Sequence, residues 1–459
     1  MATYLIVGNG VAGTRAAEAI RERDGRGAII ILGDEPYPFY YRPQLADLAI
    51  GRATEKSIAA KHDSFYRERR IDARPGRRVA GINAKKHQIT LDDGEALRYD
   101  RLLIATGSVP RRGEWPGSNL EGVIALWNLD DARKIAGWKG LKRAVIVGEN
   151  SIGLETARAF RELGAEVIYL VRGDRFWPEM LDAEAAEIVE QNLAARGLTL
   201  RKNERLEAIL GSGRVEKVAT SANELIECQA VGVALGLDPA VGFLAGSGIE
   251  VGVGVGADKN LQTSARDVFA AGDASERPDL LSTEKRVQFG WLKAWHEGSV
   301  AGANMAGDKQ TVTDIPAVHI QIYGTDFLAL GENNPAPGSG ALKDTGYFPE
   351  MGVYKSIVRR NGTVVGATFL GNVAEAGAIE RLIAERADIA TLDGETRAQL
   401  FDQNYVRSRA VGVLCPVCKL AVALPAGAKE GDVLTCPICG ADLRLERMAN
   451  GLLGGRVAI

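Results

Sequence analysis

Residues 4–14 read Tyr-Leu-Ile-Val-Gly-Asn-Gly-Val-Ala-Gly-Thr, and this stretch decides the fold. The apolar run that opens it is typical of a buried parallel strand, and residues 14–23 predict a helix. Between them lies a G-x-G-x-x-G motif. Gly8 permits a tight turn, Gly10 lets a pyrophosphate approach the backbone, and Gly13 lets the helix pack against the strand. With the free N–H groups at the helix start, the stretch predicts a dinucleotide site; the alternative is a glycine-rich turn that binds nothing.

An acidic residue stands where the ribose of the nucleotide would lie. A second apolar run at 28–32 predicts the neighbouring strand, and Glu35 follows it, 22 residues after Gly13. A carboxylate near that spacing accepts hydrogen bonds from ribose hydroxyls. Strand, helix and acid together favour a nucleotide-binding unit at the N-terminus.

The unit recurs in altered form. Strands are predicted at 144–147 and 166–171, and the turn that follows the first of them reads Gly148-Glu-Asn-Ser-Ile-Gly153. The middle glycine is replaced by Asn150, whose side chain narrows the approach to a pyrophosphate. This second copy is therefore degenerate, and it either binds a dinucleotide or has lost its ligand.

The end of the strand at 166–171 bears on which nicotinamide cofactor fits. An acid there would pair with the 2′-hydroxyl of NAD, but the sequence has Val171 followed by Arg172. Arg172 could instead meet a 2′-phosphate, which favours NADPH, unless it is simply a solvated arginine. NADH and NADPH both stay open at this point.

Four further segments carry a family resemblance. Residues 99–108 lead a strand into an Ala-Thr-Gly turn, 232–239 follow the second unit, 267–273 end in Gly-Asp, and 291–307 predict a helix. Together with the two glycine-rich turns, this order resembles the pyridine nucleotide-disulfide oxidoreductases related to glutathione reductase. It is most similar to the branch that holds rubredoxin reductases, ferredoxin reductases and the flavin part of nitrite reductase. The resemblance covers about residues 1 to 390.

The resemblance implies an α/β fold with two Rossmann-like dinucleotide-binding domains and a C-terminal α/β domain. The expected division of the chain is an FAD domain at 1–112 and 245–312, an NAD(P) domain at 113–244, a capping or dimerisation domain at 313–392, and a small all-β zinc ribbon at 410–448.

The same resemblance implies two cofactors, FAD and either NADH or NADPH. Glu155 would lie near the hydride-transfer face and is the candidate catalytic residue. The implied contacts with FAD come from Gly8, Gly10, Gly13, Glu35, Arg42, Val79, Thr106, Gly107 and Asp273, and those with the nicotinamide cofactor from Gly148, Gly153, Arg172 and Gly236.

A missing cysteine decides the subclass. Disulfide reductases of this superfamily carry a redox cysteine near the second helix of the first domain, whereas residues 37–45 here read Tyr-Pro-Phe-Tyr-Tyr-Arg-Pro-Gln-Leu. The electrons would therefore leave the flavin directly, for a docked electron-transfer protein, another redox-enzyme subunit, a quinone-like molecule or dioxygen. His296 lies near the expected flavin helix, where an ordinary surface histidine is favoured over a catalytic base.

From about residue 313 the pattern changes to short strands. They are predicted at 318–323, 327–330, 354–360 and 363–370, with a helix at 375–386. Asn361 and Gly362, between the last two strands, are a hairpin signal. This region resembles the family's C-terminal domain, which caps the flavin or forms an interface in a homodimer or hetero-oligomer.

Four of the five cysteines form two C-x-x-C pairs, Cys415 with Cys418 and Cys436 with Cys439, separated by 17 residues. Two such knuckles aim four thiolates at one point, which predicts a tetrahedral zinc site. A rubredoxin-like iron centre is the alternative, because it uses the same knuckles. The segment also resembles the zinc-ribbon amino-group carrier proteins of lysine biosynthesis, but those end in a glutamate, so only the ribbon fold is implied. Cys228 is expected to be a small buried hydrophobe on a strand.

Composition bounds the remaining possibilities. A chain of 459 residues is too long for one core and predicts three or four units. The formal net charge of -3 argues against a nucleic-acid or anionic-membrane partner. No signal peptide or long apolar run precedes the first strand, so a cytoplasmic location without membrane insertion is expected.

The sequence therefore predicts an NAD(P)H-dependent FAD oxidoreductase that passes electrons to an acceptor protein of the rubredoxin, ferredoxin or metalloenzyme type. One alternative is the flavin subunit of a larger redox complex. The other is a non-catalytic flavin-bound sensor or assembly protein, in which the altered second turn binds no dinucleotide.

Overall fold

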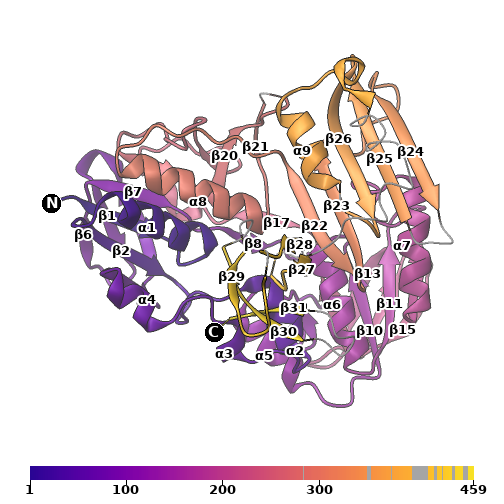
Figure 1. Cartoon of the computed structure of the whole chain (residues 1–459). Helices are drawn as coiled ribbons and strands as arrows, with labels where there is room; N and C mark the ends of the chain where they lie inside the picture. The colour runs from indigo at the N-terminus through magenta and orange to yellow at the C-terminus, as the bar shows by residue number, and fades with distance from the viewer. Residues whose placement is uncertain are drawn as a thin grey trace.

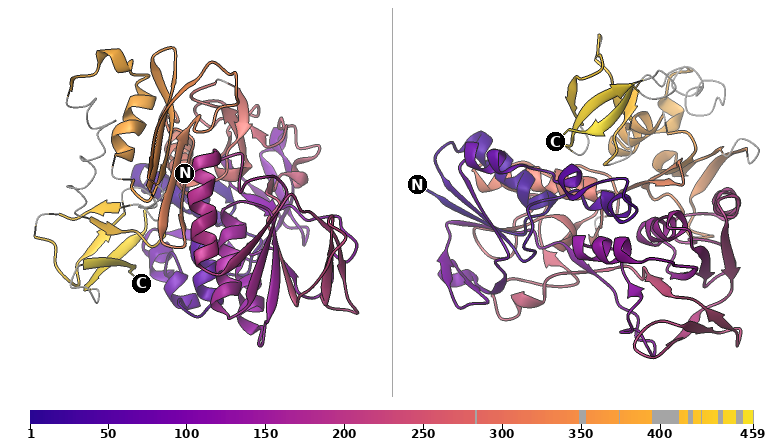
Figure 2. Two further views of the ribbon diagram at one scale, coloured as in Figure 1. Left: turned by 90° about the vertical axis from the view of Figure 1, so that its right-hand side faces the viewer. Right: turned by 90° about the horizontal axis from the view of Figure 1, so that it is seen from below.

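The computed structural model describes residues 1–282, 284–348, 353–373, 375–394, 412–417, 421–425, 427–436, 440–447 and 453–458. These residues form a mixed α/β fold with several separate sheets. Figure 1 shows two sheets flanked by helices at the left and lower right, and an antiparallel sheet at the upper right. The yellow C-terminal strands lie in front of the junction between them, as both views of Figure 2 also show.

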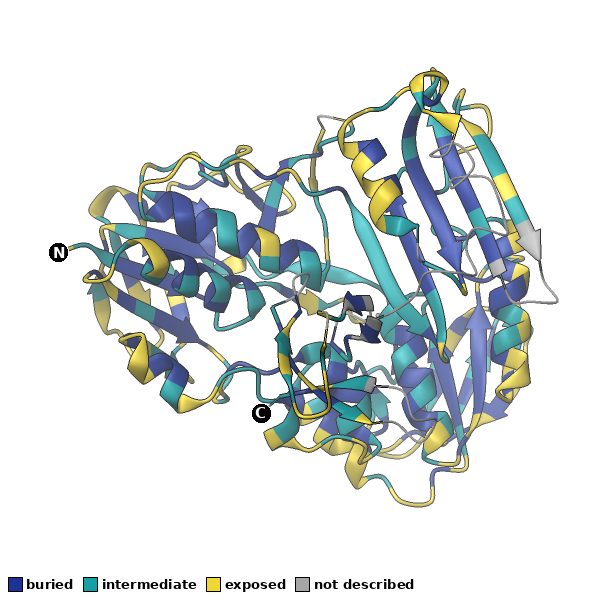
Figure 3. Cartoon of the chain, in the orientation of Figure 1, coloured by how far each residue is buried: buried dark blue, intermediate teal, exposed yellow. Residues whose placement is uncertain are grey.

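The first sheet is parallel and is built from two distant parts of the chain. Its strands are, in spatial order, β19 (Val268–Ala270), β7 (Arg101–Ile104), β1 (Thr3–Val7), β2 (Ala28–Gly33) and β3 (Ile71–Pro75). The inner strands are almost wholly buried, as a parallel sheet covered on both faces requires (Figure 3).

Two helices pack closely on one face of this sheet, α1 (Val11–Arg23) and α8 (Trp291–Met305). A side chain on Gly298 or Gly302 of α8 would come within 2.3 Å of the backbone oxygen of Ala12 or Ala16 on α1. The two glycines therefore allow the helix backbones to touch. The predicted helices at 14–23 and 291–307 are confirmed, with α1 beginning three residues earlier, directly after Gly10.

The second sheet repeats the arrangement within one continuous stretch. Its order is β12 (Leu198–Lys202), β11 (Glu166–Val171), β10 (Arg143–Val147), β16 (Ala230–Val233) and β9 (Val123–Ile124), all parallel. Helices α5 (Leu129–Gly137), α6 (Ser151–Glu162) and α7 (Ala183–Ala195) accompany it. The predicted strands at 144–147 and 166–171 are confirmed.

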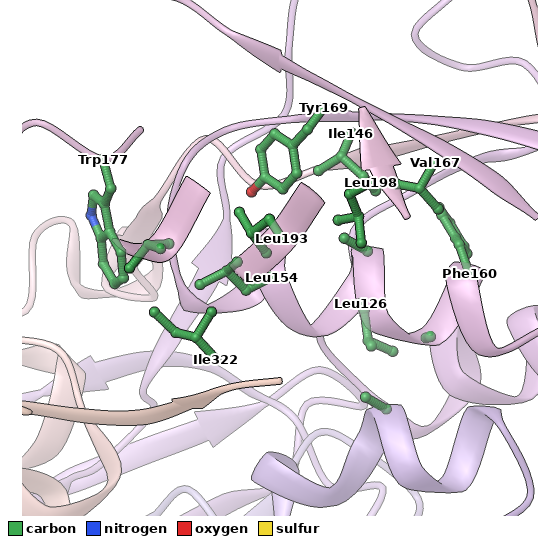
Figure 4. Packing of buried hydrophobic residues seen from close by; sticks show 14 of the residues in the cluster. Leu126, Ile146, Leu154, Phe160, Val167, Tyr169, Trp177, Leu193, Leu198 and Ile322 are labelled. Carbon is green, nitrogen blue, oxygen red and sulfur yellow. The ribbon is translucent and has the colours of Figure 1, made fainter. Parts of the chain in front are cut away.

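A large hydrophobic core joins this second sheet to the C-terminal sheet. Leu154 of α6, Leu193 of α7 and Tyr169 of β11 lie in one buried cluster with Ile322 (Figure 4). Ile322 belongs to β22 (Ala317–Ile322), the first strand of the C-terminal sheet. The C-terminal region therefore packs against the second sheet.

Two chain crossings link the first and second sheets. The short strands β8 (Ser108–Pro110) and β17 (Leu237–Pro239) pair with each other in antiparallel fashion where the chain leaves the first sheet and returns to it. Three small sheets fill the periphery: β4 (Val79–Asn83) with β5 (Gln88–Leu91) and β6 (Ala96–Arg98); β13 (Leu206–Leu210) with β14 (Lys217–Thr220) and β15 (Leu225–Glu227); and β18 (Val255–Gly256) with β20 (Ser275–Pro278) and β21 (Lys285–Val287).

We call the first sheet with α1 and α8 the first lobe, and the second sheet with α5, α6 and α7 the second lobe. Short helical segments complete the two lobes. They are η1 (Arg42–Gln44), α2 (Leu45–Ala49), α3 (Glu55–Ile58), α4 (Asp63–Glu68), η2 (Ala84–Lys86), η3 (Gly242–Leu244) and η4 (Gly272–Ala274). Cys228 is buried in the core of the second lobe, as expected of a small hydrophobe. The prediction that it lies on a strand is wrong by one residue, because β15 ends at Glu227.

The C-terminal sheet is antiparallel, in the order β22, β23 (Thr325–Gly331), β26 (Thr363–Leu370), β25 (Val353–Arg360) and β24 (Leu342–Phe348). Helix α9 (Ala376–Ala384) packs on it, and η6 (Ile389–Thr391) follows. The Asn-Gly hairpin is confirmed, because Arg360 pairs with Thr363 and both turn residues have positive φ, 52° and 81°. Strand β24 was not predicted.

The last part of the chain forms short antiparallel strands. They are β27 (Gly412–Leu414) with β28 (Ala421–Ala423), and β29 (Val433–Thr435) with β30 (Asp442–Arg447) and β31 (Leu453–Val457). We call these strands and the turns between them the C-terminal module. Its buried residues share one hydrophobic cluster with Tyr41, Ala60, Trp291 and Leu292 of the first lobe. The module is therefore docked on the first lobe beside the start of α8.

Candidate functional site

The two glycine-rich turns have the same backbone geometry. Gly8 and Gly148 both have positive φ, 121° and 105°. A side chain on Gly8 would come within 2.0 Å of the oxygen of Ala105, and one on Gly148 within 1.9 Å of the oxygen of Ala234. Each turn thus contacts the backbone just after the neighbouring strand, β7 for Gly8 and β16 for Gly148, and only glycine fits there. Both copies keep the frame that a Rossmann-like nucleotide site requires.

The turns differ where a pyrophosphate would lie. Gly10 is the N-cap of α1, and a side chain there would meet nothing within 4 Å, so the first turn of that helix faces open space. Asn150 is the N-cap of α6, and its Oδ1 accepts from the N–H groups of Ile152 and Gly153 at 3.0 and 3.1 Å. Its Nδ2 donates to the oxygen of Ala234 at 2.6 Å. The sequence indicated that Asn150 narrows the approach of a pyrophosphate to the backbone, but it did not indicate that its side chain caps α6.

Glu35, the acidic residue predicted to bind the ribose of FAD, lies against Arg42, which is also predicted to contact FAD. Glu35 pairs with Arg42, and the hydroxyl of Tyr40 donates to the other Glu35 oxygen at 2.6 Å. Burial raises the pKa of Tyr40, so this hydroxyl stays protonated and keeps donating. Arg42 also donates to the backbone oxygen of Trp127 at 2.8 Å. This pairing holds the carboxylate of Glu35 in place after β2.

Asp273 lies at the junction of three elements. It follows β19 in η4, and its carboxylate accepts from Ser108 Oγ at 2.7 Å and from the N–H of Gly290, just before α8, at 3.2 Å. Burial raises its pKa, and the nearby charge of Lys293 opposes that shift. A partly buried carboxylate with so few donors suits a ligand hydroxyl, which fits the implied contact with the ribityl chain of FAD.

The Ala-Thr-Gly turn lies directly beside Asp273, because Ser108, the residue after Gly107, donates to the carboxylate of Asp273. Thr106 Oγ1 donates to the oxygen of Ala240 at 2.9 Å, which ties the turn to the returning chain. Gly107 has a positive φ of 69° and open space above it. The structure therefore brings Thr106, Gly107 and Asp273 together at one edge of the first sheet.

Sequence reasoning missed a buried ionic network beneath this edge. Glu297 of α8 is fully buried and accepts from the N–H of Gly272 at 2.7 Å, from Ser275 Oγ at 2.7 Å and from Arg277 at 2.5 Å. Lys293, one turn earlier on α8, donates to the oxygen of Gly272 at 2.9 Å. The network fixes the loop around Asp273 to the helix. Its sequence signal was a lysine and a glutamate four residues apart on an otherwise small-residue helix face.

The candidate catalytic residue Glu155 is engaged in an ion pair. Arg158, on the next turn of α6, lies 2.6 Å from Glu155 and also 2.9 Å from Asp47 of α2. About a third of the Glu155 side chain is exposed. The pairing orients the carboxylate, and Arg158 connects α6 to α2 of the first lobe.

The remaining predicted contacts lie at the edges of the two sheets. Gly13 and Gly153 pack against the oxygens of Gly8 and Gly148, so they close the helix onto the strand as expected. Val79 is buried at the start of β4, and Gly236 lies just before β17 with a positive φ of 100°. Arg172 is exposed at the end of β11.

Two of the four predicted metal ligands lie among the described residues. Cys415 and Cys436 are fully buried in the cluster that joins the C-terminal module to the first lobe. The N–H of Cys436 donates to the backbone oxygen of Ala441 at 2.7 Å, and the backbone oxygen of Cys436 accepts from the N–H of Gly440 at 2.9 Å. Cys418 and Cys439 lie outside the described residues, within which no group of three or more His, Cys, Asp or Glu is placed to hold a metal.

His296, the other residue that the sequence singled out, is exposed on α8 and its ring lies edge-on to Trp295. In the described part of the chain, every helix is too short or too polar to cross a lipid bilayer.

Comparison with known proteins places this geometry in a family. The family model for pyridine nucleotide-disulphide oxidoreductases matches residues 2–288. The chain is 29% identical over 392 residues to the NAD(P)H nitrite reductase of Bacillus subtilis (strain 168), a match that covers 84% of this chain and 48% of that enzyme. The chain thus spans about half the length of this relative.

A second relative is matched over most of its length. The chain is 31% identical over 347 residues to the ferredoxin reductase component of chlorobenzene dioxygenase from Cupriavidus sp. (strain PS12), covering 75% of this chain and 84% of that protein. The fold is similar to that of the ferredoxin reductase for the CYP199A2 system from Rhodopseudomonas palustris, with a TM-score of 0.80 and 22% identity over 88% of this chain and 98% of that one. The protein therefore belongs to the pyridine nucleotide-disulphide oxidoreductase family, as an oxidoreductase of the NAD(P)H-dependent flavoprotein type.

Proposed function

We propose that the protein takes electrons from a nicotinamide cofactor and passes them through FAD to an acceptor protein, without a redox-active disulfide. One observation carries the proposal: two sheets have the same glycine-turn geometry and are joined by the paired crossings β8 and β17, and the partly buried Asp273 lies beside the crossing. FAD would lie on the first turn and the nicotinamide cofactor on the second. FAD supplies acceptance of a hydride and release of electrons one at a time or in pairs.

The chain's own residues would bind and orient these groups. The open first turn of α1 offers N–H groups to a pyrophosphate, and Glu35, held by Arg42, offers a carboxylate to the ribose. Asp273 would accept a ribityl hydroxyl, with Thr106 and Gly107 beside it, and Val79 would add a buried apolar contact. On the second lobe Gly148, Gly153 and Gly236 would shape the site, and Glu155 would lie near the nicotinamide.

Release to an external acceptor is proposed because aromatic residues stand where a disulfide reductase carries its thiol. Phe39 and Trp291 stack at 5.8 Å, and Tyr41 and Trp291 lie 5.7 Å apart, beside the start of α8. The names of the relatives point the same way, since one is a ferredoxin reductase component of a dioxygenase. By analogy the partner is an electron-transfer protein or a subunit of a redox enzyme. A flavin subunit within a larger complex is the second candidate, because the chain matches half of a nitrite reductase.

The C-terminal module is proposed to be a zinc ribbon. Its support is the spacing of the two C-x-x-C pairs and the burial of Cys415 and Cys436 in a single cluster between antiparallel strands. A metal would stabilise a module whose own apolar core is small. Iron is the alternative occupant, and colour distinguishes the two, because ferric iron bound by four thiolates is red and zinc is colourless.

The lobes are proposed to correspond to an FAD domain at 1–112 and 245–312, an NAD(P) domain at 113–244, a capping or dimerisation domain at 313–392 and the ribbon at 410–448.

The proposed oxidoreductase function is tested by anaerobic titration of the purified, flavin-loaded protein. Bleaching of the flavin band by one equivalent of reduced nicotinamide cofactor is expected. A colourless protein that takes up no added FAD would contradict the proposal, and a flavin that no nicotinamide bleaches would favour the sensor or assembly role.

A further inference from the structure

The end of β11 carries a carboxylate that does not come from β11 itself. Glu149, between Gly148 and Asn150 in the second glycine-rich turn, accepts a hydrogen bond from the backbone N–H of Arg172 at 2.8 Å. β10 and β11 are parallel neighbours, with Val147 opposite Leu170, so both chains emerge from the sheet at the same edge. The side chain of Glu149 crosses this edge and reaches the place where the adenosine ribose lies in Rossmann-like domains.

The first copy of the unit shows the same direction of approach. Asn9 is the residue between the two glycines of the first turn, and a side chain on Gly33, at the end of β2, would come within 3.0 Å of its Cβ. There the acid comes from the chain after the strand, as Glu35. In the second copy that stretch begins with Arg172 and offers no acid at the equivalent position, and the carboxylate comes from the turn instead.

The surroundings of Glu149 favour a hydroxyl and disfavour a phosphate. Glu149 is partly buried, and burial, more than any other cause, raises its pKa. A carboxylate short of donors gains from a hydroxyl group that donates to it. The charge of nearby Glu179 also raises the pKa of Glu149 and adds to the negative potential, whereas Arg172, whose side chain is exposed, lowers that pKa through its backbone N–H and its charge. A 2′-phosphate, which carries up to two negative charges, would meet repulsion here.

We propose that Glu149 accepts the 2′-hydroxyl of the adenosine ribose and so makes the protein select NADH over NADPH. The proposal rests on the proposed function, because it assumes that the second turn holds the nicotinamide cofactor. It differs from the expectation raised by Arg172, in which an arginine at the strand end would receive a 2′-phosphate. Glu149 is thus a specificity residue that approaches from the loop.

The test is binding of redox-inert probes to the flavin-loaded full-length protein by isothermal titration calorimetry. The probes are ADP-ribose, its 2′-phosphate and its 2′-deoxy form, which report on the ribose without turnover. The wild-type protein is expected to bind ADP-ribose roughly ten- to a hundredfold more tightly than either other probe, the range expected for a hydrogen bond to a charged group. In Glu149→Gln all three dissociation constants are expected to converge to within about threefold.

Two further variants make the outcome decisive. Asp174→Asn removes a charge of the same sign from an exposed position two residues beyond Arg172, and it should leave every dissociation constant within about twofold. Arg172→Gln tests the competing expectation. Tighter binding of the 2′-phosphate than of ADP-ribose by the wild type, abolished in Arg172→Gln, would overturn the proposal, and so would a preference that survives in Glu149→Gln.

The failure of the proposed function gives a different result. If ADP-ribose binds with the expected preference but reduced nicotinamide cofactors leave the flavin band unchanged, the specificity assignment stands and the oxidoreductase function does not. If none of the probes binds, both fall, because the second turn then holds no dinucleotide. If Glu149→Gln does not fold, the wild-type comparison of ADP-ribose with its 2′-deoxy form still decides, since equal affinities would contradict the role of the hydroxyl.

Discussion

Gly10 and Asn150 occupy the same position in two copies of one turn, yet they leave different groups available. Open space lies above Gly10, whereas Asn150 satisfies the N–H groups of Ile152 and Gly153 itself. The glycine pattern was predictable, because the turn needs residues with positive φ and no side chain, and the spacing of Gly8 and Gly148 in their motifs indicates those positions. The cap was not, because an asparagine side chain can turn toward the helix or toward a ligand, and the sequence does not distinguish the two.

Residues that act through long-range contacts were also beyond sequence reasoning. Glu35 and Arg42 were both expected near FAD, but nothing in their spacing showed that they pair with each other. Lys293 and Glu297 were missed because their partners, the residues of the Asp273 loop, lie some twenty positions away in the chain. The chemistry of a site is readable from a motif, whereas the side chains that hold it are set by tertiary packing.

At the scale of single residues, Asp273→Asn is expected to stabilise the flavin-free protein at neutral pH. Burial raises the pKa of Asp273 above its ordinary value, so the folded state keeps the proton to higher pH than the unfolded state. The free energy of unfolding therefore falls as pH rises from about 4, where unfolded aspartate ionises, through the raised folded value. Asparagine carries no such charge, and a gain of about 1 kcal/mol at pH 7.5, vanishing near pH 4, is expected.

The measurement is urea unfolding of flavin-free protein at pH 4 and pH 7.5. The exposed Asp174→Asn is the control and should show no pH-dependent gain. The same Asp273→Asn change should weaken FAD binding roughly tenfold, because a neutral amide accepts a hydroxyl more weakly than a carboxylate does. Loss of stability at neutral pH in Asp273→Asn would show that the carboxylate is stabilising and would contradict this account.

At the scale of elements, those with strong periodicity were predictable. The strands at 166–171 and 363–370 were placed to the residue, because each is a short, largely apolar run with a clear turn at one end. Strand β24 was not predicted because it is the edge strand of its sheet, where polar residues such as Lys343 and Asp344 are common. Helix α7 was overlooked although Asp182, an N-cap residue, precedes a run of strong helix formers.

Helix α8 is expected to depend on one buried carboxylate. Glu297 is fully buried and compensates both Arg277 and Lys293, so Glu297→Ala would leave Lys293 without its carboxylate and Arg277 with Asp314 alone. Removing one partner of a buried pair costs about 3 to 5 kcal/mol. The free energy of unfolding should fall by that amount in chemical denaturation, and FAD binding should weaken because Gly272, next to Asp273, loses its anchor.

A matched change on the partner helix serves as the control for α8. Glu22→Ala on α1 also removes a glutamate from ion pairs with arginines, but the side chain of Glu22 is 53% exposed. Its effect on the free energy of unfolding should stay below about 1 kcal/mol. Equal effects of the two substitutions would mean that burial does not govern the role of Glu297.

At the scale of the whole molecule, the sequence indicated the parts but not their arrangement. The two Rossmann-like units follow from local motifs, but the pairing of β8 with β17 joins residues more than a hundred positions apart. The cysteine pairs predicted a small module, yet nothing in its sequence placed it on Tyr41 and Trp291. Such contacts depend on complementary shape between surfaces, which no periodicity records.

Metal removal is expected to act on this docked module first. If the cysteines hold zinc, stripping it with a chelator should unfold the module, because its folding free energy comes largely from the metal. Tyr41 and Trp291 would then lose their apolar cover, so tryptophan fluorescence should shift to longer wavelength as about one metal per chain is released. Bound flavin should remain, because the sheet that carries the first turn has its own core.

Two cysteine substitutions separate the metal site from general thiol effects. Cys436→Ser should lower the metal content and reproduce the fluorescence shift in the untreated protein. Cys228→Ala, in the core of the second lobe, should keep the full metal content. Full metal retention in Cys436→Ser would remove Cys436 from the site.

The divided first sheet also orders events on the ribosome. The lobe built around β10 is continuous, so it can close once residue 233 has emerged, whereas the N-terminal lobe lacks β19 and α8 until residue 305. At typical synthesis rates of about 5 to 20 residues per second, the nascent chain holds α1 and β7 uncovered for tens of seconds after they have left the exit tunnel. The glycines that later let α8 lie flush on α1 therefore close a lobe that began first and finishes second.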